Sequence, residues 1–234
     1  MALDVSVENA SKKHLKTILH AYRHCPSTVR LRVLIRYLLC PFSSILRWFP
    51  SSGKILDVGC GDGLLLYLLS LMPQSSDRAY FGIDPAENKI QIARSLKTDN
   101  IDFSTGEVSE LPSETYDCIS LIDVLLLVPR TNWPNLLNHC VRVLRNDGLL
   151  IVKDCTNRPR WKRWLAHLQE IVSVKITRMT LGGWPHYEPL DVFKETIEAA
   201  GAQVFLTERV DAGYPHPQFL MLARKTNSQT SHAV

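Results

Sequence analysis

Lys54-Ile-Leu-Asp-Val-Gly-Cys-Gly-Asp-Gly63 is the stretch of sequence that decides the fold of this chain. Its apolar opening predicts a buried strand. Its three alternating glycines predict a tight turn that a ligand can approach closely, because glycine has no Cβ to clash. The apolar residues 64–71 follow at once and predict a helix. Strand, glycine turn and helix in this order indicate an α/β protein that binds a nucleotide-like ligand.

Two acidic residues accompany this turn. Asp57 lies two positions before the first glycine, and Asp84 follows Gly63 by 21 positions, at the end of the next strand-like run. An acid about 20 residues beyond a glycine turn is placed to bind ribose hydroxyls. The turn has no lysine or arginine for a phosphate, and its last glycine comes one residue early for a dinucleotide fingerprint. It therefore favours a ligand with a ribose and a cationic or zwitterionic part, such as S-adenosylmethionine.

Five motifs in order resemble those of the class I S-adenosylmethionine-dependent methyltransferases. They are Asp57–Gly63, Gly82–Pro85, Gly106–Pro112, Tyr116–Ile122 and Val143–Val152. The resemblance covers residues 52–153, about two fifths of the chain. One departure is the pair Glu107-Val108, where the family more often has Asp-Ala.

The resemblance implies that S-adenosylmethionine is the cofactor, and it assigns the binding to residues of these motifs. The expected cofactor-binding residues are Asp57, Gly59, Cys60, Gly61, Gly63, Asp84, Pro85, Glu107, Val108 and Ile122. In the third motif of the family an acidic residue, here Glu107, meets the adenine amino group.

Strand-like and helix-like runs alternate along the chain, which predicts an α/β sheet. The expected strands are Lys54–Val58, Ala79–Ile83, Ile101–Ser104, Asp117–Ile122, Gly148–Lys153, Gln203–Thr207 and Gln218–Ala223. The expected helices are Gly63–Met72, Glu87–Lys97, Trp133–Leu144 and Leu190–Ala200. The last two strands are joined by a link too short for a parallel crossover, so they must be antiparallel. The expected fold is a Rossmann-like, seven-stranded, mostly parallel sheet with an antiparallel last strand, helices on both faces and a helical N-terminal cap.

Three regions are expected along the chain. Residues 1–50 form the helical cap or lid, residues 51–225 the methyltransferase domain, and residues 226–234 a disordered tail. The segment Asn9–Phe49 is predicted to form two helices broken by Pro26 and Pro41. Both interpretations of this segment stay open: a cap on the edge of the sheet, or a lid over cofactor and substrate.

Composition argues against several classes of protein. No run of 18 apolar residues exists that would predict a membrane span, and the first ten residues lack the apolar core of a secretory signal. The six cysteines form no C-x-x-C pair, which favours a reducing compartment over a disulfide framework or a zinc site. We therefore expect a cytoplasmic protein with no metal centre.

Charge is distributed unevenly, and one segment combines it with tryptophan. Residues 1–54 hold nine basic and two acidic side chains, whereas residues 55–152 hold seven and thirteen. Within Cys155–His186, Trp161 and Trp164 recur at helical spacing with Leu165 and Leu168, among the cations Arg158, Arg160, Lys162 and Arg163. Such a helix can pack on the domain, lie peripherally on an anionic membrane, or meet RNA phosphates or an acidic soluble substrate. The single apolar face favours a membrane or lipid partner over nucleic acid.

The acceptor is expected beyond the carboxyl ends of the strands, where open α/β sheets bind ligands. The loops there contain Asp123, Gly182–Glu188 and Gly213–Pro217. His186 and His216 lie in these loops and are candidate general bases, because histidine titrates near neutrality. A base is needed only for an acceptor whose proton must leave, such as a hydroxyl. The alternative for each is an ordinary solvated loop histidine.

These patterns predict a methyltransferase that acts on a small or lipid-like molecule, at oxygen or carbon. The Asp/Asn-Pro-Pro-aromatic signature of many amino-directed methyltransferases is absent after Asp117, which disfavours nucleic-acid or protein amines. Two alternatives stay open: an RNA methyltransferase and a non-catalytic protein that binds S-adenosylmethionine. The sequence leaves the acceptor and the oligomeric state undetermined.

Overall fold

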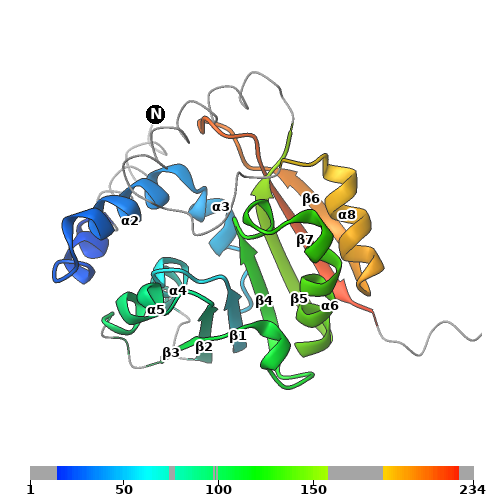
Figure 1. The fold of residues 1–234 in the computed structure, drawn as a ribbon, viewed down its shortest axis with the longest axis horizontal. Helices are drawn as coiled ribbons and strands as arrows, with labels where there is room; N and C mark the ends of the chain where they lie inside the picture. Colours follow the sequence, from blue (N-terminus) through cyan, green and yellow to red (C-terminus); the bar gives the residue numbers. More distant parts are fainter. Residues whose placement is uncertain (1–14, 74–76, 97, 99, 158–186, 227–234) are drawn as a thin grey trace, which may run out of the picture.

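The computed structural model describes residues 15–73, 77–96, 98, 100–157 and 187–226 of the chain. Within these residues a seven-stranded sheet has the order β3-β2-β1-β4-β5-β7-β6 (Figure 1). The strands are β1 (Gly53–Val58), β2 (Arg78–Asp84), β3 (Ile101–Thr105), β4 (Tyr116–Ile122), β5 (Leu144–Cys155), β6 (Ala202–Arg209) and β7 (Gln218–Lys225). All seven expected strands are confirmed.

Strand directions follow from the lengths of the connections. Strands β3, β2, β1, β4 and β5 pair in parallel, whereas β7 is antiparallel to both β5 and β6. The antiparallel pairing of β6 with β7 confirms the expectation drawn from their short link. Strand β1 lies between β2 and β4, so the chain order reverses there. In open α/β sheets this reversal point, at the carboxyl ends of the strands, is where ligands bind.

Helices cover both faces of the sheet (Figure 1). They are α2 (Ser27–Leu39), α3 (Phe42–Leu46), α4 (Leu64–Ser70), α5 (Glu87–Arg94), α6 (Trp133–Val143) and α8 (Leu190–Ala199). Short 3₁₀ turns form at η2 (Val108–Glu110), η3 (Leu125–Leu127) and η4 (Arg130–Asn132). Successive strand residues point to opposite faces, so Ile55 packs in the cluster with α4 and α5, and Leu56 in the cluster with α6 and α8. This is why the strands of the motifs are continuously apolar.

The N-terminal segment packs directly on this core. Residues 15–21 are helical, and Pro26 and Pro41 stand immediately before α2 and α3. The described part thus has three helical pieces where two were expected, because proline is tolerated only at the start of a helix and each proline begins a new one. Tyr22 and Val33 belong to the same buried cluster as Ile55. Whether residues 1–50 form a separate domain stays a prediction.

One other difference from the expected elements is local. Strand β5 begins at Leu144, four residues before the expected start at Gly148, because Leu144 already pairs with Tyr116.

All six cysteines are free and five of them are buried, as expected for small apolar side chains. Among the described residues, no helix has the length and apolar character needed to cross a bilayer. The Trp161–Trp164 segment and the tail beyond Thr226 lie outside the described residues.

Candidate active site

The glycine turn after β1 is built from left-handed backbone. Gly59, Gly61 and Gly63 have φ values of 74°, 57° and 82°, which residues with a side chain rarely adopt. A Cβ on Gly59 would lie 2.8 Å from Val124, and one on Gly63 would lie 2.8 Å from Phe103. A Cβ on Gly61 would meet only the Arg36 guanidinium, at 3.2 Å. Gly59 and Gly63 are therefore needed for packing, whereas the Arg36 side chain is the group that stands over Gly61.

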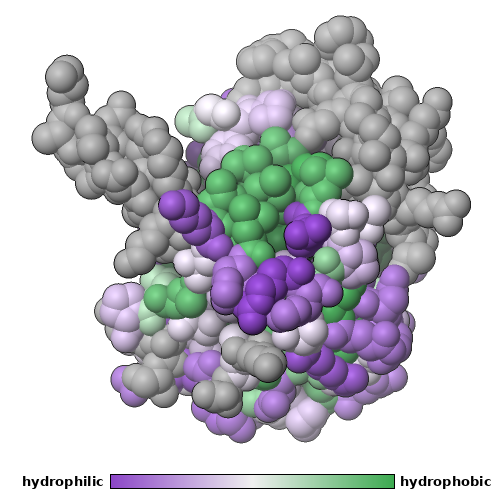
Figure 2. Space-filling view, turned by 90° about the vertical axis from the view of Figure 1, so that its left-hand side faces the viewer, coloured by the Kyte–Doolittle hydropathy of each residue, from purple (hydrophilic) through white to green (hydrophobic). Residues whose placement is uncertain are grey.

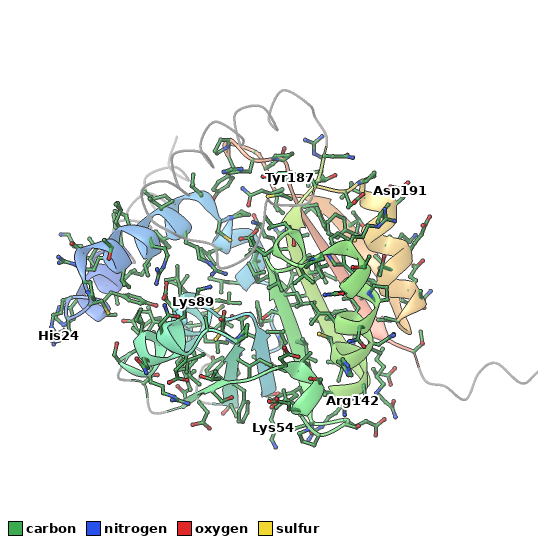
Figure 3. All side chains as sticks on the ribbon, in the orientation of Figure 1. His24, Lys54, Lys89, Arg142, Tyr187 and Asp191 are labelled. Carbon is green, nitrogen blue, oxygen red and sulfur yellow. The ribbon has the colours of Figure 1, made fainter. Side chains whose placement is uncertain are left out.

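Asp84, at the end of β2, is fixed against this turn. Its Oδ2 accepts a hydrogen bond from the Gly61 amide at 3.0 Å, and its Oδ1 accepts one from the Ala86 amide at 2.9 Å. The Lys89 ammonium, labelled in Figure 3, lies 4.0 Å from the same carboxylate. Each oxygen keeps a second lone pair for a ligand hydroxyl. The expected ribose-binding acid is thus held in one orientation beside the glycine turn.

Asp57 is almost fully buried under the turn. Ser120 of β4 donates a hydrogen bond of 2.7 Å to its Oδ1. Burial raises the pKa of Asp57 to about 7, against the opposing effects of the Ser120 bond and the Arg36 charge. A ligand with an ammonium group placed nearby would favour the ionised carboxylate.

Side chains of the N-terminal helical segment hold the glycine turn in place through hydrogen bonds. Arg32 of α2 binds both carboxylate oxygens of Asp62, at 2.8 and 2.6 Å, and the Tyr22 hydroxyl donates to the Asp62 carbonyl at 2.7 Å. One helical turn later, Arg36 donates to the Ile122 carbonyl at 3.2 Å. Sequence reasoning did not assign these arginines. The available signal was a pair of cations one turn apart, Arg32 and Arg36, on the same side of the helix as Val29 and Val33.

The remaining expected cofactor residues lie at the same edge of the sheet. Cys60, Val108 and Ile122 are buried, whereas Pro85 and Glu107 are exposed. Glu107 caps η2 reciprocally with Glu110. Arg142 of α6, labelled in Figure 3, also holds η2 in place, because it donates to the carbonyls of Val108 and Ser109 and to that of Leu111 just after η2. The structure thus brings all ten expected positions to one edge, and their individual binding roles stay predictions.

The donor set of this edge fits S-adenosylmethionine. The Asp84 carboxylate suits the ribose hydroxyls. Asp57 and Arg36 offer opposite charges for the ammonium and carboxylate of the methionine part.

A second polar cluster lies at the adjacent ends of β4 and β5. The Lys153 side chain is only 2% exposed and pairs with Asp123, whose side chain is 28% exposed and whose φ is 58°. The Asp123 amide donates to the Lys153 carbonyl at 2.8 Å. Burial of a lysine is costly unless a carboxylate compensates it, and the Asp123 charge holds the pKa of Lys153 above its usual value. Lys153 therefore stays a cation inside the protein.

Asp154 and Cys155 continue this cluster. The Asp154 carboxylate accepts the amides of Cys155 at 2.7 Å and Leu126 at 3.2 Å, which fixes η3 to the end of β5. Ligand atoms of Asp123, Asp154 and Cys155 lie within 4.8 Å of one another. The Lys153 ammonium already supplies a positive charge to Asp123 there.

His216 lies in the link between β6 and β7, where the charges of Lys153 and Asp123 act on its imidazole. Burial and the Lys153 charge lower its pKa from the usual 6.5, although the Asp123 charge opposes them. Its imidazole is therefore neutral at pH 7 and able to accept a proton. Tyr214 of the same link is influenced by Lys153 as well, and burial raises its pKa. The other candidate base, His186, lies outside the described residues.

The Arg32–Asp62 pair is expected to contribute measurably to stability, because both side chains are mostly buried, at 18% and 10% exposure. A double-mutant cycle with Arg32→Met and Asp62→Asn should give a coupling of about 1–3 kcal/mol in urea unfolding. The matched control is the Arg47–Glu208 pair, exposed by 52% and 39%, for which about 1 kcal/mol or less is expected. Equal couplings for the two pairs would contradict the fastening of α2 to the glycine turn.

Comparison with known proteins identifies the family of this chain. Residues 31–206 match the family described as a methyltransferase domain. An uncharacterised methyltransferase of Schizosaccharomyces pombe is 35% identical over 109 residues, 44% of this chain and 40% of that protein. The mitochondrial ubiquinone biosynthesis O-methyltransferase of Bos taurus is 33% identical over 113 residues, 44% of this chain and 29% of that protein. The chain thus spans less than half the length of these curated relatives.

Solved structures agree on the fold. An S-adenosylmethionine-dependent methyltransferase from Methanosarcina mazei superposes with a TM-score of 0.60 at 16% identity, over 78% of this chain and 97% of that one. The [4+2]-cyclase SpnF superposes with a TM-score of 0.58 at 17% identity, over 79% and 78% of the two chains. At these identities the likeness concerns the fold alone, and the cyclase illustrates that one fold serves more than one reaction.

Proposed function

The chain belongs to the class I S-adenosylmethionine-dependent methyltransferases, and we propose that it methylates a hydroxyl oxygen of a small or lipid-like acceptor. The observation that carries the choice of oxygen is the cluster of Lys153, Asp123 and His216 at the carboxyl ends of β4 and β5. The names of several relatives, the ubiquinone biosynthesis O-methyltransferases, support the same choice.

The cofactor-binding edge would hold and orient the methyl donor. Asp84 would accept the ribose hydroxyls, while Asp57 and Arg36 would pair with the amino-acid part. S-adenosylmethionine supplies a methyl group that is already electrophilic, so holding the nucleophile in line accounts for much of the rate. In this arrangement no residue of the chain has to form a covalent bond with either ligand.

The second cluster would prepare the acceptor. A neutral His216 imidazole can accept the proton of a hydroxyl through a ring nitrogen, and the buried Lys153 ammonium would stabilise the oxygen anion that results. Asp123 would keep the ammonium in place, because it pairs with Lys153 from the end of the neighbouring strand. A neutral amine acceptor needs neither a base nor an adjacent cation, so the cluster suits oxygen better than nitrogen.

Transfer of radiolabelled methyl groups tests this proposal. The full chain is incubated with labelled S-adenosylmethionine and either a cellular lipid extract, a panel of simple phenols or bulk tRNA. We expect label in alkali-stable methyl ethers of the lipid or phenol samples. Label that appears in tRNA would overturn the acceptor class. Tight cofactor binding with no transfer to any of the three samples would favour the non-catalytic alternative.

A further inference from the structure

The helix α2 has an apolar face on each side. Val29 and Val33 are 7% and 2% exposed and pack toward the core, on the side of the helix that also carries Arg32 and Arg36. On another face Leu31 and Leu38 are 44% and 56% exposed, although leucine is usually buried. Figure 2 views the side of the molecule that carries α2 and shows an apolar patch there, bordered by hydrophilic residues.

The exposed leucines form part of a regular stripe. Leu31, Leu34, Ile35 and Leu38 stand at positions i, i+3, i+4 and i+7, so they share one face of the helix. Leu34 and Ile35 are only partly buried. An apolar stripe of this length on a surface helix, in the described part of the chain, indicates a contact with a partner.

The N-terminal segment that carries the stripe has charge of a single sign. Residues 15–50 contain no aspartate or glutamate, while Arg30 is exposed on α2 itself and Lys16 and Arg23 are exposed in the residues that precede it. A helix that combines an apolar stripe with cations alone has the composition of one that lies in the interface of an anionic bilayer.

We propose that the stripe of α2, together with Arg30 and the exposed cations that precede the helix, docks the protein on an anionic lipid surface. A second copy of the chain is disfavoured as occupant, because a twofold contact would place the same cations against each other. RNA would use the cations but not the leucines. The inference goes beyond the proposed function and does not require methyl transfer.

Docking at α2 would place the lipid surface on a helix that also contacts the cofactor-binding edge. Arg32 and Arg36 of the same helix hold Asp62 and the Ile122 carbonyl. A bilayer that binds the outer face of α2 therefore contacts a helix whose inner face fastens the glycine turn.

Vesicle flotation tests the proposal on the full chain at low salt. We expect binding to vesicles of phosphatidylcholine with phosphatidylglycerol and little binding to phosphatidylcholine alone. The variant L31S/L38S should bind about tenfold or more weakly, because two apolar side chains are lost from the contact. The matched control L71S/F205S removes two other exposed apolar residues, 43% and 51% exposed, and should bind as the parent chain does.

Charge is tested separately. The variant R23Q/R30Q should lose about fivefold in affinity for anionic vesicles per charge removed. Its remaining binding should depend less steeply on the salt concentration. Calorimetric cofactor binding, expected to be unchanged in all variants, confirms that each remains folded. The proposal is overturned if L31S/L38S floats as well as the parent chain, if the parent chain does not float, or if the leucine variant instead abolishes a dimer seen in sedimentation.

Discussion

Asp84→Ala is expected to weaken S-adenosylmethionine binding by about 100-fold or more. The carboxylate of Asp84 joins the Gly61 and Ala86 amides, so its loss frees the glycine turn and removes the acceptors for the ribose. Two hydrogen bonds to a charged group are worth about 3 kcal/mol or more together, which corresponds to this factor. Titration calorimetry of the purified variant measures it.

Two further variants separate binding from folding. Asp84→Asn keeps one carbonyl acceptor and should lose less affinity than the alanine variant. Asp102→Ala removes an exposed acid from the neighbouring strand β3 and should leave affinity unchanged. If Asp84→Ala unfolded at the same urea concentration as the parent chain and still bound the cofactor normally, the assignment of Asp84 to the ribose would be wrong.

His216→Gln is expected to lower kcat by about 100-fold or more, since a positioned general base contributes about 10²–10⁴-fold. Its low pKa also fixes the sign of the pH dependence. The base works in its neutral form, so kcat of the parent chain should be level above pH 6.5 and fall as the pH drops through the lowered pKa of His216. In the glutamine variant that acid limb should disappear. His139→Gln, on α6, is the control and should keep the parent profile.

Lys153→Met refines the same prediction. Removal of the buried cation takes away one of the two causes that lower the pKa of His216, so the acid limb should move to higher pH. Asp123 would lose its partner at the same time, so Lys153→Arg is included to retain the charge. If the acid limb of the kcat profile stays at the same pH in both Lys153→Met and Lys153→Arg, Lys153 does not act on His216.

The fold was predictable where the pattern is local. Ile55 and Leu56 lie on opposite faces of β1 and are both fully buried, so the strand reads as one apolar run. Asp57 and Asp84 were predictable because Asp57 lies near the end of the strand before the glycine turn and Asp84 ends the next strand, 21 residues after Gly63. The prolines located the helix starts at α2 and α3, but they did not reveal that three helical pieces would form.

The parts of the site that could not be predicted depend on pairs of residues that are far apart in the sequence. Arg32 meets Asp62, and Lys153 meets Asp123, in each case across 30 residues and two different elements. Nothing in the local pattern names either partner, because the contacts exist only after the sheet has formed. A signal for Lys153 was nevertheless present, since a lysine that ends an apolar strand-like run such as Gly148–Lys153 needs a carboxylate partner if it is buried.

The central claim is that this chain binds S-adenosylmethionine through the edge formed by Asp57–Gly63 and Asp84. Titration calorimetry of the parent chain with S-adenosylmethionine, S-adenosylhomocysteine and NAD tests it most directly. We predict one site for S-adenosylmethionine, competition by S-adenosylhomocysteine, no heat with NAD, and loss of the site in Asp84→Ala. Binding of NAD without binding of S-adenosylmethionine would contradict the claim.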